Sequence, residues 1–246
     1  MEHKLKRIPV MAAAALASVA AFFLRRHQLS AAFDANGLPV PGAASGLLAW
    51  FSVLMVLLFA AYAFFLRRRR TYKAANSRGE LAFTLSLLAG ALLAMGGIWQ
   101  LISGVQKFAL AQAVCLVLVA VCWIITALQR YNGQIVSPWL FLFPALYFTV
   151  ELLVKFRGWG NDPVVLDYCF ELMALIGTMC GLFQSAGFCF DRGHRRTAVF
   201  FCLFGVFFGA ASVADASGAE ILVRLAPILW LEASLWQLLR PGKQRT

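Results

Sequence analysis

Long runs of apolar residues, separated by short polar segments, make up most of the chain. Several of these runs reach the roughly 20 residues that an α-helix needs to cross about 30 Å of hydrocarbon. The pattern predicts an all-α integral membrane protein, a polytopic bundle of eight transmembrane helices joined by short loops. The predicted spans are residues 8–24, 46–66, 81–102, 108–128, 138–156, 164–190, 198–214 and 219–239.

The first apolar run has a second interpretation, which would leave seven spans. A basic start followed by an alanine-rich run is also typical of a signal peptide. Because the numbered chain begins at Met1 and includes this run, we expect it to be retained as a span. We expect residues 25–45 to form the one long loop, and residues 1–246 to form a single transmembrane helical domain.

Composition agrees with a membrane protein. Hydrophobic residues make up 61% of the 246 positions and charged residues 13%, with a mean hydropathy of +0.77. A chain of this composition has too little polar surface to cover a water-facing globule. The net charge of +11 does not indicate nucleic-acid binding, because the basic residues lie between the spans and form no basic folded domain.

The distribution of basic residues predicts the orientation of the chain. Sixteen of the 22 Lys and Arg residues lie before the first span, after the last, or in alternate connections. The positive-inside rule then places both termini in the cytoplasm, in a bacterial-type cytoplasmic membrane. Two arginine clusters on that side are expected to contact anionic lipid headgroups. They are Arg67, Arg68, Arg69 and Arg70, and Arg192, Arg195 and Arg196.

The fifth and sixth spans and their connection carry six charged side chains within residues 151–171. Glu151 and Lys155 stand one helical turn apart, as do Asp167 and Glu171. Glu171 lies about 12 Å along its helix from Pro163, well inside the hydrocarbon. An ionised carboxylate facing lipid costs at least about 2.5–3.5 kcal/mol, so we expect these groups to turn inward and meet.

Other spans place polar side chains at a similar depth, which predicts a polar pocket facing outward. An acidic lining would favour a cationic or zwitterionic solute. Two of the pairs, Glu151 with Lys155 and Glu220 with Arg224, also fit ordinary intrahelical ion pairs. The candidate ligand-binding residues are Gln100, Gln112, Glu151, Lys155, Asp167, Glu171, Glu220, Arg224 and Glu232.

Motifs for metal, cofactor or nucleophilic chemistry are absent from the sequence. It contains no HExxH, Walker A, GxGxxG or GxSxG pattern, and its three histidines lie outside the apolar runs. The six cysteines lie inside those runs without a CxxC pair, as expected of small buried apolar residues. We therefore expect no cofactor and no metal ion.

Two glycine pairs have the GxxxG spacing that lets membrane helices approach closely, Gly177 with Gly181 and Gly205 with Gly209. They favour close packing inside the bundle, or alternatively a homodimer interface.

Three classes of function remain open. The first is a small-solute transporter or permease subunit, and the second is a non-catalytic sensor or assembly subunit that binds a membrane partner. The third is a membrane-embedded enzyme that uses Asp167 and Glu171 as acid and base on a lipid-like substrate. Because no nucleophile or metal motif accompanies the carboxylates, we expect solute binding rather than catalysis.

Overall fold

The computed structural model of the chain describes residues 8–31, 45–66, 79–103, 107–159 and 165–240. This part of the chain forms eight α-helices, each long and apolar enough to span a membrane. The all-α prediction with eight spans is therefore confirmed. The helices are α2 (Ile8–Ala31), α3 (Ser45–Phe65), α5 (Glu80–Ile102), α6 (Lys107–Asn132), α7 (Trp139–Trp159), α8 (Val165–Cys189), α9 (Arg195–Val213) and α10 (Ala219–Leu239).

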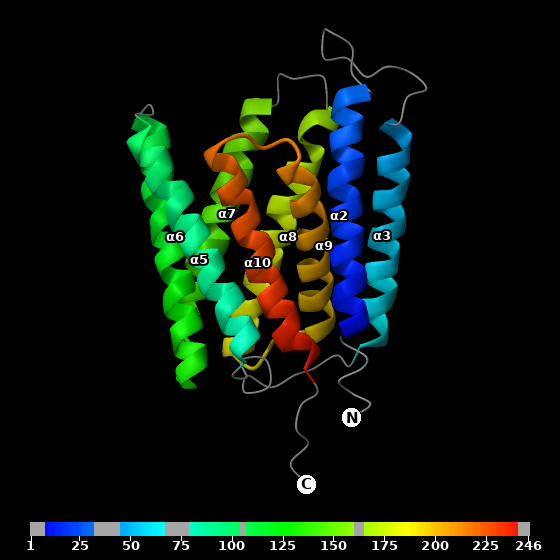
Figure 1. Cartoon of the computed structure of the whole chain (residues 1–246). Coiled ribbons are helices and arrows are strands. Elements are labelled where there is room, and N and C mark those ends of the chain that lie inside the picture. Colours follow the sequence, from blue (N-terminus) through cyan, green and yellow to red (C-terminus); the bar gives the residue numbers. More distant parts are fainter. Residues whose placement is uncertain (1–7, 32–44, 67–78, 104–106, 160–164, 241–246) are drawn as a thin grey trace.

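The helices run alternately up and down in one bundle (Figure 1). Helix α2 begins and α10 ends at the lower end in this view, while α5 and α7 end at the upper end. Helix α9 contacts α2, α3, α8 and α10, and α10 also contacts α5 and α8. Helices α9 and α10 therefore lie between α2 and α3 on one side and α5, α6 and α7 on the other.

Glycines allow the central helices to approach closely. A Cβ atom added at Gly177 of α8 would lie 2.5 Å from the Cα atom of Gly205 in α9. A Cβ atom added at Gly205 would lie 2.5 Å from Leu231 Cδ1 of α10. Both glycine pairs make such contacts with neighbouring helices, so they pack within the bundle rather than on a surface open to a second copy.

Two apolar cores fill the bundle, and α8 and α10 contribute side chains to both. The first joins α2, α3, α8, α9 and α10, and the second joins α5, α6, α7, α8 and α10. In the second core the indoles of Trp123 and Trp230 stack with centroids 4.7 Å apart and planes 7° from parallel. Large apolar side chains such as Trp50 and Phe65 are exposed on the outside, as expected of a lipid-facing surface.

Helix α2 continues seven residues past the predicted end at residue 24, so the expectation of a loop beginning at residue 25 was wrong. Arg25 and Gln28 lie on one face of the extended helix and are 0% and 1% exposed. The guanidinium of Arg25 is paired with Asp215, which stabilises the charge inside the protein. The helix can therefore continue where the sequence pattern indicated an end.

Arginines at the lower end contact aromatic rings and the ends of neighbouring helices. Arg130, in the last turn of α6, stacks its guanidinium 4.9 Å from the Phe141 ring centroid. Arg195 Nε donates to the Leu238 carbonyl at 2.9 Å, and Arg196 Nε donates to the Leu66 carbonyl at 2.6 Å. Cations at carbonyls near helix C-termini are favourable because those carbonyls lack partners within the helix.

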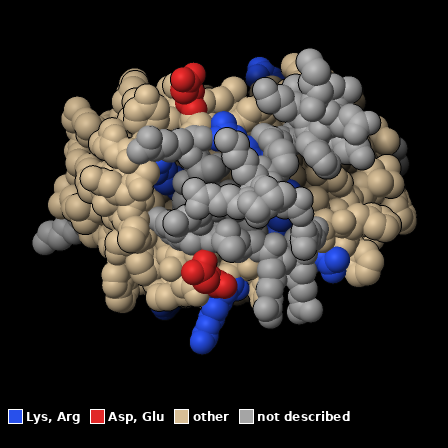
Figure 2. All heavy atoms as spheres, turned by 90° about the horizontal axis from the view of Figure 1, so that it is seen from below, with Lys and Arg blue, Asp and Glu red and all other residues tan. Residues whose placement is uncertain are grey.

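Seen from the lower end, basic side chains of the described residues lie at several places around the face, with acidic side chains among them (Figure 2). The predicted headgroup cluster Arg67, Arg68, Arg69 and Arg70 lies outside the described residues.

Candidate functional site

A cavity of about 480 Å³ lies between α5, α6, α7, α8, α9 and α10, towards the upper end of the bundle. Seven of the nine candidate residues line it, and they come from five of the six helices. Those seven are Gln100, Gln112, Glu151, Lys155, Glu171, Glu220 and Arg224.

Five of these residues form an alternating series of acidic and basic groups, which we call the charge chain. Glu171 lies at its centre, with Oε1 bound to Lys155 Nζ and Oε2 2.9 Å from Arg224 Nη2. Lys155 Nζ also lies 3.7 Å from Glu151 Oε1, and Arg224 Nη2 lies 3.3 Å from Glu220 Oε2. The charge chain thus runs Glu151, Lys155, Glu171, Arg224, Glu220, across α7, α8 and α10.

Helical spacing and helix packing together place these groups. Glu151 and Lys155 share one face of α7, which packs on α8, and Glu220 and Arg224 share one face of α10. Arg224 is further fixed because its Nη1 donates to the Ser212 carbonyl at 2.6 Å, near the C-terminal end of α9. A helix C-terminus carries partial negative charge, so this contact also stabilises the guanidinium.

The described cavity lining has more carboxylates than cations, three against two. The carboxylate of Glu151 is 8% exposed, and its Oε2 atom has no hydrogen-bond partner among the described residues. The hydroxyl of Tyr147, one turn earlier on α7, interacts with the side chains of Glu151 and Gln112, but the Oε2 atom itself has no hydrogen-bond partner among the described residues. A buried acceptor without a donor is costly, so Oε2 is a position where a bound N–H group would be favourable.

Much of the remaining lining is apolar, and four hydroxyl side chains also line the cavity: Ser103, Thr178, Ser212 and Ser217. Trp99, Phe148 and Leu175 contribute apolar surface. Pro227 lies inside α10 and has no N–H, so it cannot donate to the Val223 carbonyl four residues earlier. Val223 and Pro227 both line the cavity, so the missing helix hydrogen bond lies at the cavity wall.

A second charged cluster beside the cavity was not found from the sequence. Arg25 Nε and Nη2 donate to the two carboxylate oxygens of Asp215 at 2.9 and 3.2 Å, and Nη1 donates to Gln28 Oε1 at 2.9 Å. The guanidinium also lies 5.0 Å from the ring centroid of Phe170, the neighbour of Glu171. These bonds fix the α9–α10 connection, whose Ser217 lines the cavity.

Asp215 lies in that connection, between the spans. Burial raises the pKa of its carboxyl above the usual value, and the hydrogen bonds and positive charge of Arg25 oppose this rise. The only sequence signal for this cluster was Gln28 standing one turn after Arg25, since Asp215 is 190 residues away.

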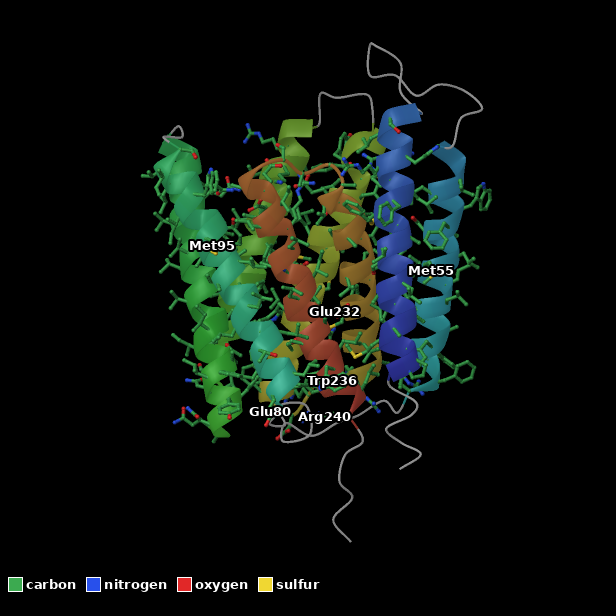
Figure 3. The ribbon with its side chains drawn as sticks, viewed as in Figure 1. Met55, Glu80, Met95, Glu232, Trp236 and Arg240 are labelled. Carbon is green, nitrogen blue, oxygen red and sulfur yellow. The ribbon has the colours of Figure 1, made fainter. Side chains whose placement is uncertain are left out.

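Two candidate residues are not part of the described site. The side chain of Asp167 lies outside the described part of the structure. Glu232 does not line the cavity, and Figure 3 shows it in the lower half of α10, above Trp236 and Arg240. Glu232 follows Arg224 by eight residues on the same helix, which places it about 12 Å lower and rotates it roughly 80° around the helix axis. The expectation that Glu232 joins the pocket is therefore not met.

Glu232 is half-buried, and among the described residues it has no ion-pair or hydrogen-bond partner. We expect Glu232→Leu to raise the melting temperature of the purified protein by several degrees, because an uncompensated carboxylate near the centre of a span costs about 2.5–3.5 kcal/mol if ionised. Glu232→Gln should recover a smaller part of this gain. A lower melting temperature for both variants would show that the carboxylate makes a favourable contact.

The described residues contain no group of three or more His, Cys, Asp or Glu side chains arranged to hold a metal ion. The cysteines Cys115, Cys122, Cys169, Cys180, Cys189 and Cys202 are free thiols. No protein-family model, curated protein or solved structure matches the chain.

Proposed function

We propose that the protein binds a small cationic or zwitterionic solute in this cavity and moves it across the membrane, as a transporter or permease subunit. The observation that carries this proposal is the charge chain inside the cavity, with its excess carboxylate and the unpaired Glu151 Oε2 atom. A buried polar group persists in a membrane at a free-energy cost, which makes it a candidate for function rather than for stability.

The lining supports a solute that is part charged and part apolar. An ammonium group would find acceptors in Glu151 and in the Val223 carbonyl, whereas a carboxylate would be attracted by Arg224. Trp99 and Phe148 would cover an apolar portion of the solute. A volume of about 480 Å³ falls within the range typical of small-molecule sites, which combine apolar walls with a few polar groups.

The position of the cavity supports transport rather than binding alone. It lies between six helices, and one of them, α10, contains a proline, Pro227, where it lines the cavity. A proline inside a helix leaves one backbone carbonyl without its usual donor and favours a bend at that point, and both properties are common in transport pathways. The distribution of Lys and Arg favours an orientation with the lower end in the cytoplasm, so that the cavity faces outward.

A thermal-stability screen of the full chain in nanodiscs tests the proposal. We expect stabilisation by members of a panel of primary amines, amino acids and polyamines, and none by the matching carboxylates. A ligand at 100 times its dissociation constant adds about 2.7 kcal/mol to stability, which is readily measured. Glu151→Gln should abolish this shift, whereas Glu232→Gln, on the same bundle but outside the cavity, should retain it.

A positive result leads to flux measurements in liposomes, where the same solute should enter in a Glu151-dependent manner. If no amine, amino acid or polyamine stabilises the wild type, the cavity is not a site for cationic or zwitterionic solutes. The partner-subunit interpretation would then be favoured.

A further inference from the structure

We propose that Lys155 is an internal competitor for the solute, and that its ammonium group occupies the position taken by a primary ammonium group of the bound solute. This inference rests on the proposed function and specifies the substrate class and regulation of the same site. In the empty protein Lys155 neutralises the carboxylates of Glu151 and Glu171. On binding, the solute ammonium replaces Lys155, whose side chain moves out towards water.

The ammonium group of Lys155 lies between the carboxylates of Glu151 and Glu171. Its Nζ atom binds Glu171 Oε1 and lies 3.7 Å from Glu151 Oε1. The two carboxylate side chains are 8% and 10% exposed, whereas that of Lys155 is 26% exposed. Of these three groups, Lys155 is therefore the one with a path to solvent.

The position of Lys155 near a helix end also allows its side chain to move. It lies four residues before the end of α7 at Trp159, so its Cα atom is about 6 Å from the upper end of the helix. Its flexible four-carbon stem can carry the ammonium to the interface while the stem stays in apolar surroundings. No comparable movement is open to Arg224, which is held by Glu171, Glu220 and the Ser212 carbonyl.

The exchange leaves the remaining pairs in place. When Lys155 departs, Glu171 Oε2 keeps its contact with Arg224 at 2.9 Å. The incoming ammonium restores the lost positive charge between Glu151 and Glu171, and it can also donate to Glu151 Oε2, which has no hydrogen-bond partner among the described residues. The carboxylates are thus never both left in a low-dielectric site without a cation, which would be strongly unfavourable.

Competition of this kind has a measurable consequence. The apparent affinity for solute is reduced by the fraction of molecules in which Lys155 has left its position. Removing the lysine charge should therefore strengthen binding, whereas the same change would weaken binding if Lys155 contacted the solute directly. The exchange also predicts selectivity for ammonium groups that donate N–H bonds, over quaternary ammonium of the same charge.

The experiment is a titration of the full chain in nanodiscs with butylamine, and with butyltrimethylammonium as the probe that lacks N–H donors. We expect Lys155→Met to bind butylamine about tenfold or more tightly than wild type, with butyltrimethylammonium bound more weakly by both proteins. Arg157→Met removes an exposed cation two residues away and serves as the matched control, and its affinity should change less than about threefold.

The outcomes separate this inference from the proposed function. If wild type binds butylamine in a Glu151-dependent manner and Lys155→Met binds it equally or more weakly, internal competition is refuted while the binding site stands. If neither wild type nor any variant binds any amine, amino acid or polyamine, the proposed function fails. If Lys155→Met does not fold, Lys155→Arg is the deciding variant. Its guanidinium can bridge both carboxylates, so butylamine should bind more weakly than to wild type. Unchanged or tighter binding would overturn the inference.

Discussion

We expect Asp215→Ala to lower the free energy of unfolding by about 3–5 kcal/mol, because removal of one partner from a buried ion pair leaves the other without compensation. Arg25 is 0% exposed, so water cannot take the place of the lost carboxylate beside its guanidinium. The substitution removes both carboxylate oxygens that accept from its Nε and Nη2 atoms. Gln28 remains as an acceptor, but it carries no negative charge.

The size of this effect can be measured by thermal melting of the purified protein, where 1 kcal/mol corresponds to roughly 2–4 °C for a chain of this length. Asp215→Asn should cost less than Asp215→Ala, since Asn retains one acceptor. In addition, burial favours the neutral form of this carboxyl, as the raised pKa shows. Arg26→Gln is the matched control, because Arg26 is exposed and next to Arg25 in the sequence. Its melting temperature should not change.

A double variant tests whether the pair itself stabilises the protein. Arg25→Met combined with Asp215→Leu removes both charges, and replacement of a buried pair by apolar residues is often neutral or stabilising. We expect it to recover most of the stability lost in Asp215→Ala. If Asp215→Ala alone melts at the wild-type temperature, the Arg25–Asp215 contact makes no net contribution.

The positions of the spans and the convergence of charges could be predicted because the membrane imposes both. Lipid offers no partner to backbone polar groups, so long apolar runs must be helices. Lipid also makes a charged side chain costly, so Glu151, Glu171 and Arg224 had to find partners inside the bundle. Neither argument needs the tertiary structure, and the structure shows eight helices and brings these three residues to one cavity.

The cluster around Arg25 could not be predicted in the same way. A charge at the end of an apolar run usually marks the interface, and no local pattern connects Arg25 with Asp215. Their contact depends on how α2 packs on α9, which is set by small residues such as Ala14, Ala17 and Ala21. The orientation of Glu232, in contrast, could have been predicted from the sequence. Its eight-residue spacing from Arg224 already placed it on another face of α10.

Glu171→Gln should impair both stability and binding, because Glu171 is the carboxylate that joins the two cations of the charge chain. We expect a loss of about 2–4 kcal/mol, somewhat below the value for a fully buried pair because Lys155 can reach water and Arg224 retains Glu220. We also expect amine-induced stabilisation to disappear. Thermal melting with and without butylamine measures both effects on one sample.

The double variant Glu171→Gln/Arg224→Gln distinguishes a structural role of Glu171 from a role in binding. It removes the 2.9 Å pair as a unit and leaves Glu151 with Lys155 on α7, while Glu220 is exposed to solvent. Stability should therefore return most of the way to wild type, as a double-mutant cycle for a directly contacting pair predicts. Binding should not return, because the position between Glu151 and Glu171 then has one carboxylate instead of two. Recovery of binding together with stability would show that Glu171 only supports the fold, and the solute position would then have to lie at Glu151 and the Val223 carbonyl.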